Sequence, residues 1–484
     1  MKKTASLLAV LILLLTAAFP AVSAKDSSLG FSYYMDENVD RYLAMPIAYD
    51  YAGHIRAVEG YEFSTFKEPK GMYIDNQTDR LFVADTGNNC VAVLDLKGSL
   101  ITVIKEAGGT ALKGPEDIFV TAEGEIFIAD TGNYRIIRLD TDYAFLQEYR
   151  KPTDSSLDSN FTFTPNKVGV SNIGMIYTLA QDSLMTLDSE GNFKGYLGET
   201  KSGFSLKRLL IRLFASDEQL EWIGEQPRST YLSMYMAGDG FIYATTNDTG
   251  GQISKITSVG ENIYKRMYFG ESSYNNQGNQ TNPNFVDITV DRQGMITIVD
   301  TNTGMLYQYD QEGNNICIFG SGKGTDKEEQ LSLPSALEHD SEGNIYVLDA
   351  GTSMIHIYSP TDFIRSVHEA IYTYSEGDYD ASEAAWNQVL DSNANYALAH
   401  KGLGNIYYKH QDWESSMKEY ETANYRQGYS KAFEKARTDF SALYFGLVVL
   451  GVAAVLAVLI LIVKYTKRLA DHINDVMLGL KKRR

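Results

Sequence analysis

Cysteine, histidine and basic residues are scarce in this chain of 484 residues, and each scarcity excludes a class of protein. Two cysteines form at most one disulfide, so a fold held together mainly by disulfides is excluded. The seven histidines show no set of three, or of two with a carboxylate, at metal-ligand spacing. Lys and Arg total 43 against 62 Asp and Glu, a net charge of −19, which argues against a nucleic-acid partner.

Apolar and aromatic residues, by contrast, are plentiful. Hydrophobic residues make up 44% of the chain, with 33 Tyr and 21 Phe, which excludes a disordered protein. At roughly 150 residues per domain, the length predicts about three structural units rather than one small fold.

The N-terminus has the pattern of a secretory signal. Lys2 and Lys3 precede an apolar run, and Val22-Ser23-Ala24 supplies small residues at the usual cleavage spacing. We therefore expect residues 1–24 to be a signal peptide, followed by an N-terminal lead-in over residues 25–52.

The C-terminus has the pattern of a membrane anchor. Residues 442–463 contain no charged side chain and are long enough to cross the hydrocarbon as a helix. The tail 464–484 is basic, which predicts that it lies in the cytoplasm. Together with the signal peptide, this predicts a single-pass protein of the cell membrane whose N-terminal domains are extracytoplasmic.

The middle of the chain is repetitive. Units beginning at Pro69, Pro115, Pro165, Ser229, Asn284 and Pro334 each show short strands separated by polar turns. Six such units predict a mainly β fold, a six-bladed β-propeller over residues 53–360. The last unit has only three strands, so we expect residues of about 53–59 to supply its fourth and to close the ring.

The turns carry a family resemblance. The strand-DTGN-strand pattern in the first two units, with Gly-Asn-Ile-Tyr-Val in the sixth, resembles the NHL-repeat propellers. In this resemblance Asp caps the turn and Gly permits a positive φ, so both are structural residues. The turn residues are Asp85, Gly87, Asn88, Asp130, Gly132 and Asn133.

An insertion interrupts the repeats at residues 204–223. Its leucines recur at helical spacing opposite Lys207, Arg208 and Arg212, which predicts a helical hairpin. Packing on the propeller is the simpler interpretation, and contact with a partner or a lipid surface is the alternative.

After residue 362 the apolar period changes to about 3.6. Two units of 34 residues superpose without a gap over residues 362–428, which resembles a pair of tetratricopeptide (TPR) repeats. An α-helical TPR module is therefore expected, with a capping helix at 429–441 leading into the transmembrane helix. The expected helix-packing residues are Ala370, Ser382, Trp386, Leu403, Gly404, Tyr407, Ser416, Tyr420 and Ala423.

Catalytic motifs are not evident in the sequence. It contains no nucleophile elbow, phosphate loop or CxxC motif. His339 takes a place in the first strand of its unit, where a core or channel histidine is expected rather than a metal ligand. Cys90 and Cys317 fall in blades that blade six separates, so no disulfide is expected. We name no catalytic, cofactor-binding or metal-binding residue.

These patterns favour a membrane-anchored extracytoplasmic interaction or scaffold protein. The order of its parts resembles bacterial surface proteins encoded near carbohydrate ABC transporters. That resemblance implies a protein partner, such as a transporter or a neighbouring membrane protein, and a carbohydrate as a further ligand. The alternatives are a metal-dependent, lactonase- or lyase-like propeller enzyme, which would show carboxylates converging at one mouth of the ring, or a solute-binding sensor.

Overall fold

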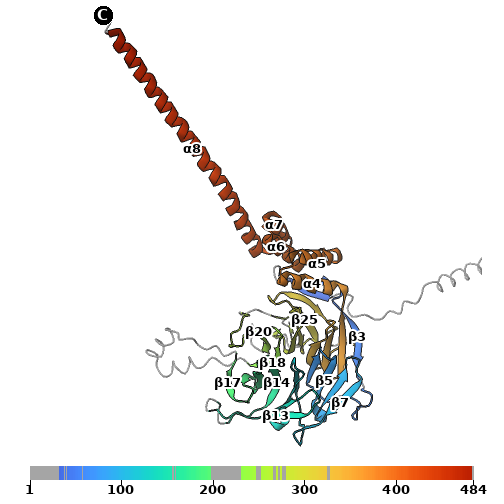
Figure 1. Cartoon of the computed structure of the whole chain (residues 1–484). Coiled ribbons are helices and arrows are strands. Elements are labelled where there is room, and N and C mark those ends of the chain that lie inside the picture. Colours follow the sequence, from blue (N-terminus) through green and yellow to red (C-terminus); the bar gives the residue numbers. More distant parts are fainter. Residues whose placement is uncertain are drawn as a thin grey trace, which may run out of the picture. The chain divides into compact units, whose positions relative to one another are not determined.

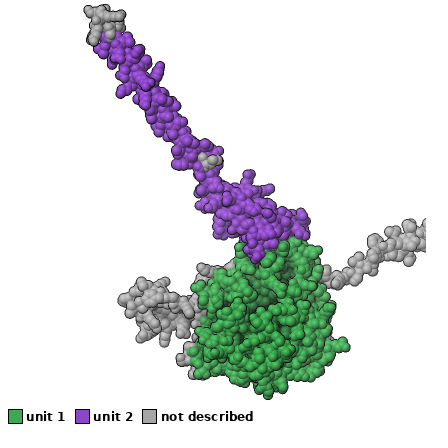
Figure 2. All heavy atoms as spheres, viewed as in Figure 1, with its two compact units in different colours: residues 1–372 green, residues 373–484 purple. Residues whose placement is uncertain are grey.

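The computed structural model describes residues 32–36, 39, 41–56, 58–154, 157, 160–197, 230–246, 252–264, 269–270, 273–274, 280–323 and 327–481. The predicted signal peptide and the predicted helical insertion at 204–223 lie outside the described residues. The chain divides into two compact units, Met1–Tyr372 and Thr373–Arg484 (Figure 2).

The first unit is a β-propeller, and its first three blades are four-stranded antiparallel sheets (Figure 1). Blade 1 consists of β4 (Gly71–Asp75), β5 (Arg80–Asp85), β6 (Cys90–Asp95) and β7 (Leu100–Ile104). Blade 2 consists of β10 (Asp117–Val120), β11 (Ile126–Asp130), β12 (Arg135–Leu139) and β13 (Phe145–Tyr149). Blade 3 consists of β14 (Pro165–Val170), β15 (Ile176–Ala180), β16 (Ser183–Leu187) and β17 (Phe193–Tyr196).

The remaining blades are less regular. Among the described residues blade 4 has three strands, β18 (Tyr231–Met236), β19 (Ile242–Thr246) and β20 (Ile253–Ile256). Blade 5 contains β23 (Phe285–Val290), β24 (Ile296–Asp300), β25 (Met305–Tyr309) and β26 (Asn315–Phe319). Blade 6 contains β27 (Pro334–His339), β28 (Ile345–Asp349) and β29 (Met354–Pro360). Short hairpins, β8 (Glu106–Ala107) with β9 (Thr110–Ala111) and β21 (Ser273–Tyr274) with β22 (Gln280–Thr281), lie in the connections.

The ring closes through the N-terminal part of the chain, as the sequence predicts. Strand β3 (Tyr49–Ile55) pairs antiparallel with β29, and His54 lies opposite His356. The strand begins earlier than the predicted 53–59, so only its last residues coincide with that segment. The six-bladed propeller is confirmed.

The lead-in at 25–52 is more ordered than a simple connection. Strands β1 (Ser32–Asp36) and β2 (Arg41–Met45) form a hairpin that joins the outer edge of blade 5, where Tyr33 lies opposite Ile318. A six-stranded sheet results. This pairing joins segments far apart in the chain, so no local pattern indicates it.

The apolar cores lie between neighbouring blades. One cluster joins Val83 and Cys90 of blade 1 to Leu348 and Ile355 of blade 6, and another joins blades 1 and 2. Because each blade is covered on both faces, strands such as β28 are buried along their whole length. The sequences of these strands are therefore continuous apolar runs and do not alternate between apolar and polar residues.

The chain continues as helices after Pro360. Helix α4 (Asp362–Glu376) spans the boundary between the units, and α5 (Tyr379–Ser392), α6 (Ala397–Lys409) and α7 (Trp413–Thr422) follow. Asp378 and Asp412 cap α5 and α7 by accepting hydrogen bonds from Ala381 N and Ser415 N. A C-terminal helical region is thus confirmed.

Helix α8 (Arg426–Lys481) is one uninterrupted helix of 56 residues (Figure 1). It combines the predicted capping helix, span and basic tail, which the sequence treats as separate segments. Among the described residues it is the one helix long and apolar enough to cross a membrane, with a mean hydropathy of 3.2 in its most apolar part.

Candidate functional site

The inner strands of the six blades bring polar residues to the axis of the ring. Strand pairing places one residue of each inner strand at the same level. This residue lies opposite the penultimate residue of the second strand of its blade. These six residues are Gly71, Asp117, Lys167, Ser233, Asp287 and Ala336. Four of them are polar, although most neighbouring positions in these strands are apolar.

The polar members of this level contact one another. Lys167 Nζ lies 2.9 Å from Asp287 Oδ1 and 3.5 Å from Asp117 Oδ1. Ser233 Oγ donates a hydrogen bond to Asp287 Oδ1. We call Asp117, Lys167, Ser233 and Asp287 the axial cluster. Because they come from blades 2, 3, 4 and 5, their contacts cross the centre of the ring.

Backbone groups complete the axial cluster. Val168 N donates to Asp117 Oδ2 at 2.9 Å, and Leu337 N donates to Asp287 Oδ2 at 2.8 Å. Each aspartate therefore also holds the inner strand of the next blade. The side chains of Lys167, Asp117 and Asp287 are 12%, 8% and 5% exposed, so these bonds form largely away from water.

A second level lies two residues further along the inner strands. It contains Tyr73, Phe119, Gly169, Tyr235, Thr289 and Glu338. Thr289 Oγ1 donates to Glu338 Oε2 at 3.3 Å and lies 2.9 Å from His339 Nδ1. Tyr73 donates to the carbonyl oxygen of Val120, which links blades 1 and 2.

Burial changes the protonation of these groups. It raises the pKa of Asp117 to about 6, against the opposing effect of Lys167. Burial, and then the charge of Asp287, raises the pKa of Glu338 well above its usual value. Burial alone would lower the pKa of Lys167, but Asp117 and Asp287 raise it, so the ammonium stays charged. Burial lowers the pKa of His339 to about 4.

The geometry limits what the axial cluster can do. The charged amine of Lys167 is not a nucleophile at neutral pH, and it occupies the space between the two aspartates. Each aspartate oxygen in the cluster already accepts a hydrogen bond or ion pair. In the part of the chain that the structure describes, no three His, Cys, Asp or Glu side chains are arranged to hold a metal ion. Two carboxylates do converge, but both are paired with Lys167, whose single charge balances one of the two negative charges.

The DTGN turns are built differently from the sequence expectation. Asp85 and Asp130 are fully buried, yet neither side chain caps the short helix that follows it. Asp85 Oδ1 accepts from Lys67 N and Asp130 Oδ1 from Lys113 N, both at 2.8 Å. The aspartates therefore tie the turn to the connection entering the inner strand. Asn88 and Asn133 donate to the second oxygen of the same aspartates.

The two glycines of these turns also have a different role. Gly87 and Gly132 do not have a positive φ; the left-handed residues are Asn89 and Tyr134, with φ of 56° and 57°. A Cβ at Gly87 would lie 2.6 Å from the carbonyl oxygen of Lys67, and one at Gly132 would lie 2.5 Å from that of Lys113. Glycine is required because two backbone segments approach closely.

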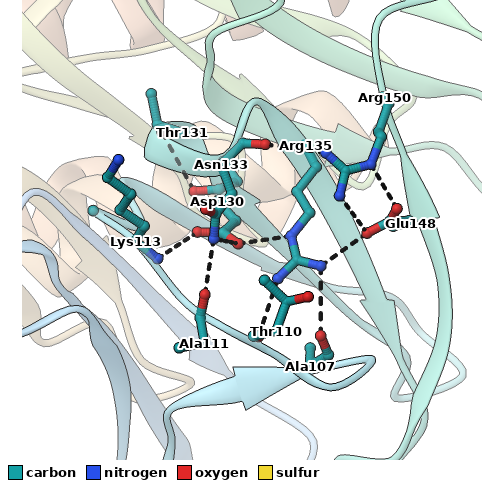
Figure 3. A network of polar contacts seen from close by, with 12 residues as sticks. Ala107, Thr110, Ala111, Lys113, Asp130, Thr131, Asn133, Arg135, Glu148 and Arg150 are labelled. Carbon is teal, nitrogen blue, oxygen red and sulfur yellow. Dashed lines mark hydrogen bonds and ion pairs between the residues drawn. The ribbon is translucent and has the colours of Figure 1, made fainter.

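Blade 2 adds a buried ion pair to this turn (Figure 3). Arg135 is 1% exposed, and its Nε donates to Asp130 Oδ2 at 2.8 Å. Its Nη1 donates to Glu148 Oε2 at 2.8 Å, and Arg150 contacts the same glutamate from the surface. Because every partner lies in blade 2 or its entry loop, this network is a structural support.

Three of the predicted helix-packing residues, Gly404, Ser416 and Tyr420, lie where α6 and α7 contact each other. Ser416 Oγ donates to the carbonyl oxygen of Gly404 at 2.8 Å, and a Cβ at Gly404 would lie 2.6 Å from the Tyr420 ring. Tyr407 donates to Glu383 Oε1 at 2.9 Å. The other members of the set are buried, namely Ala370, Ser382, Trp386, Leu403 and Ala423.

The histidines and cysteines of the propeller are structural in this geometry. His339 is buried and pairs with Thr289, as expected for a core histidine. His54 and His356 lie on the two outermost strands of blade 6, away from the axial cluster. Cys90 and Cys317 are buried free thiols, which confirms that they form no disulfide.

Comparison with known proteins supports the resemblance in part. The NHL repeat model matches residues 66–94, which lie in blade 1. The search of curated proteins found no match. Among solved structures, a streptogramin B lyase is 12% identical with a TM-score of 0.40, covering 64% of this chain and 97% of its own.

Two further solved structures are similar at the same level. Virginiamycin B lyase from Staphylococcus aureus is 13% identical with a TM-score of 0.37, covering 61% of this chain and 84% of its own. A protein of unknown function from Bacteroides thetaiotaomicron is 15% identical with a TM-score of 0.41, covering 68% and 90%. At these scores the likenesses carry no argument about activity.

Proposed function

We propose that this protein is a membrane-anchored scaffold whose propeller and helical region bind a partner protein. The observation that carries the proposal is a combination of two features. The axial polar groups of the ring are paired with one another, and the apolar span of α8 has no buried residue in the described chain. A propeller with saturated axial groups offers its outer surfaces for binding rather than its axis for chemistry.

The helical region supports the same role. We interpret α4 to α7 as a pair of tetratricopeptide repeats, because small residues such as Gly404 and Ser416 lie at helix crossings and aromatic residues pack against them. Such helix pairs present surfaces that bind peptides or neighbouring proteins. Residues 25–441 would lie outside the cytoplasm and the basic tail inside it. A carbohydrate transporter or a neighbouring membrane protein is the proposed partner.

The test is crosslinking in intact cells, followed by purification through a tag placed after Arg484 and mass spectrometry. We expect a membrane protein to co-purify with the full chain and to be lost when residues 373–425 are deleted. A variant with Lys409→Ala, a change confined to an exposed side chain of α6, is the control that keeps the fold. Recovery of the same proteins with and without the helical region would contradict the proposal.

One observation favours a second candidate, an extracytoplasmic propeller enzyme or solute sensor. Asp117 has a pKa of about 6, so it exchanges a proton near neutral pH. The full chain should then be screened with sugars and lactones by thermal melting and for turnover. A ligand that raises the melting temperature of the full chain, but not that of Asp117→Asn, would favour this candidate over the scaffold.

A further inference from the structure

Helix α8 carries an apolar face along most of its length. In the part before the apolar span this face is formed by Tyr429, Phe433 and Phe440. In the part after it the face is formed by Tyr465, Leu469, Ile473 and Val476. We call these residues, with those between them on the same side of the helix, the α8 face. The members within the span are Tyr444, Leu447, Gly451, Ala454, Val458 and Ile462.

The spacing shows that this is one face and not two. Its members recur at intervals of three and four residues, apart from one step of seven from Phe433 to Phe440. Phe433, Gly451 and Leu469 are each 18 residues, or five turns, apart. No proline interrupts α8, so the helix keeps its phase from end to end. The apolar residues before and after the span therefore lie on the same side.

The large side chains of the α8 face are exposed in a single chain. Their exposed fractions run from 38% at Tyr429 to 69% at Tyr465, and Phe440 is 59% exposed. The neighbouring helix α7 does not cover them: Trp413 of α7 donates to Asp439, and Ala432, the fully buried residue in this part of α8, lies off the face. The face is therefore free for another molecule.

A bilayer cannot cover the whole face. From Tyr429 to Val476 the helix extends about 70 Å at 1.5 Å per residue, whereas the hydrocarbon of a membrane is about 30 Å thick. The aromatic residues before the span and the aliphatic residues after it would both lie beyond the lipid tails. An exposed apolar row that continues on both sides of a membrane marks a contact site for another protein.

Charge and depth favour a second copy of this chain. In the tail, Lys464, Lys467, Asp471 and Asp475 lie on the other side of the helix and Arg468 lies on its flank, so two copies meeting at the α8 face keep most of these charges apart. His472, 18 residues from Ala454, lies at the edge of the face. Arg437 lies at the edge of the face in the part before the span. The anchor holds every copy at one depth, so a parallel copy presents the same face in register.

We propose that two copies of this protein associate in parallel along the α8 face. This inference rests on the proposed function, because the membrane span is what fixes the depth of both helices. Gly451 lies at the middle of the face, where a small residue lets two helix backbones approach closely. The period is closer to 3.6 than to 3.5 residues, so the two helices run nearly straight or cross with a right hand rather than forming a left-handed supercoil.

Cysteine crosslinking of the full chain in isolated membranes tests the proposal. Phe440→Cys and Leu469→Cys place a thiol on the α8 face on either side of the span. Thr438→Cys and Lys467→Cys place one on the opposite side, at exposed positions two residues away. The native Cys90 and Cys317 are buried, and the parent chain measures their background. A bismaleimide reagent should crosslink each of the two variants on the α8 face into a dimer of twice the chain mass. It should give no such dimer with the two variants on the opposite side.

The outcomes are distinct. A crosslinked product of another mass would show that a different protein occupies the face, and it would overturn the second-copy proposal. Equal crosslinking on both sides of the helix, or none at any of the four positions, would also overturn it. Failure of the proposed anchoring is seen separately, because the chain would then appear in the soluble fraction before any reagent is added.

Discussion

Lys167 illustrates how a single buried cation organises the propeller. Its ammonium lies between Asp287 and Asp117, and both carboxylates also accept backbone hydrogen bonds from the next blade. Buried charges of this kind contribute little net stability as a set, but removing one member leaves the others unpaired. The axial cluster therefore specifies how five blades meet more than it adds to the free energy of folding.

The first prediction concerns this cation. Lys167→Met is expected to lower the free energy of unfolding by about 3–5 kcal/mol, because two buried aspartates lose their counter-charge. Hydrogen exchange of β14 in the full chain measures the change. The control is Lys70→Met, which removes an ion pair to Glu116 from a side chain that is 51% exposed and should cost at most about 1 kcal/mol. Equal losses for the two variants would show that the axial cluster is not the cause.

A buried histidine in α4 makes the propeller unit sensitive to acid. His368 Nε2 lies 2.7 Å from Gln308 Oε1, and burial lowers its pKa to about 3. The unfolded chain binds a proton near pH 6.5, so this histidine destabilises the fold as the pH falls from about 6.5 towards 3. Burial lowers the pKa of His339 and of His356 as well, which acts in the same direction.

The second prediction follows from this loss of stability at low pH. Between pH 7 and pH 5 the free energy of unfolding should fall by about 2 kcal/mol less in His368→Gln than in the parent chain. Glutamine can still donate to Gln308 but does not bind a proton. Raised carboxyl pKa values, as at Asp117 and Asp291, favour the fold on acidification and are common to both proteins. Denaturant titration at the two pH values is the measurement. If the free energy of unfolding falls equally in the parent chain and in His368→Gln, the assignment to His368 is wrong.

At the scale of elements, closure of the ring depends on a strand from the other end of the propeller. Strand β3 pairs with β29 through Tyr49–Ile55. The hydroxyl oxygen of Tyr51 lies 3.2 Å from His54 Nδ1 and 3.3 Å from His356 Nδ1. The last blade is therefore complete only when the N-terminal strand is in place. Loss of β3 would expose the edge of β29.

The third prediction tests this closure. The double variant His54→Cys/His356→Cys should form a disulfide on mild oxidation, because opposed residues of an antiparallel pair lie at the required Cα distance. The bond closes a long loop and should raise the free energy of unfolding by about 2–4 kcal/mol relative to the reduced form. Each single variant is the control and should form no disulfide between residues 54 and 356. A double variant that remains reduced under the same conditions would mean that β3 does not hold this register.

The repeat pattern predicted the blades because each repeat is local in the chain. The spacing of Asp85 and Asp130 located the buried turns, but it did not show that their carboxylates bind the preceding connection. That bond runs to backbone groups 17 or 18 residues away, at Lys113 and Lys67, so turn chemistry alone could not reveal it.

The axial cluster was missed for a different reason. Its positions are equivalent in every inner strand, but they hold different residues, such as Asp117, Lys167 and Asp287, so a search for recurring motifs does not find them. Aligning the inner strands by their buried neighbours would have shown a polar residue at this position in four of the six strands. The β1–β2 hairpin could not be predicted from local sequence, because it pairs with β26 of blade 5, far away in the chain.

At the scale of the whole molecule, an acidic chain of net charge −19 ends in an apolar helix and a basic tail. The acidic body has no attraction for anionic lipid head groups, so the body alone should not hold the protein at a membrane. Residues such as Leu447 and Val463, 57% and 64% exposed in the isolated chain, are unfavourable in water. Insertion of α8 into a bilayer removes that cost.

The fourth prediction separates the contributions of the span and the tail. The full chain should sediment with membranes and resist extraction by high salt and carbonate, because about 20 apolar residues are buried in hydrocarbon. A chain ending at residue 441 should move to the soluble fraction, since it loses the span but keeps the part of α8 that packs on α7. A chain ending at residue 463 keeps the span without the basic tail and should remain with the membrane. If salt alone releases the full chain, the attachment is electrostatic and resides in the tail; if the 441 variant stays bound, it resides in the acidic body or a partner.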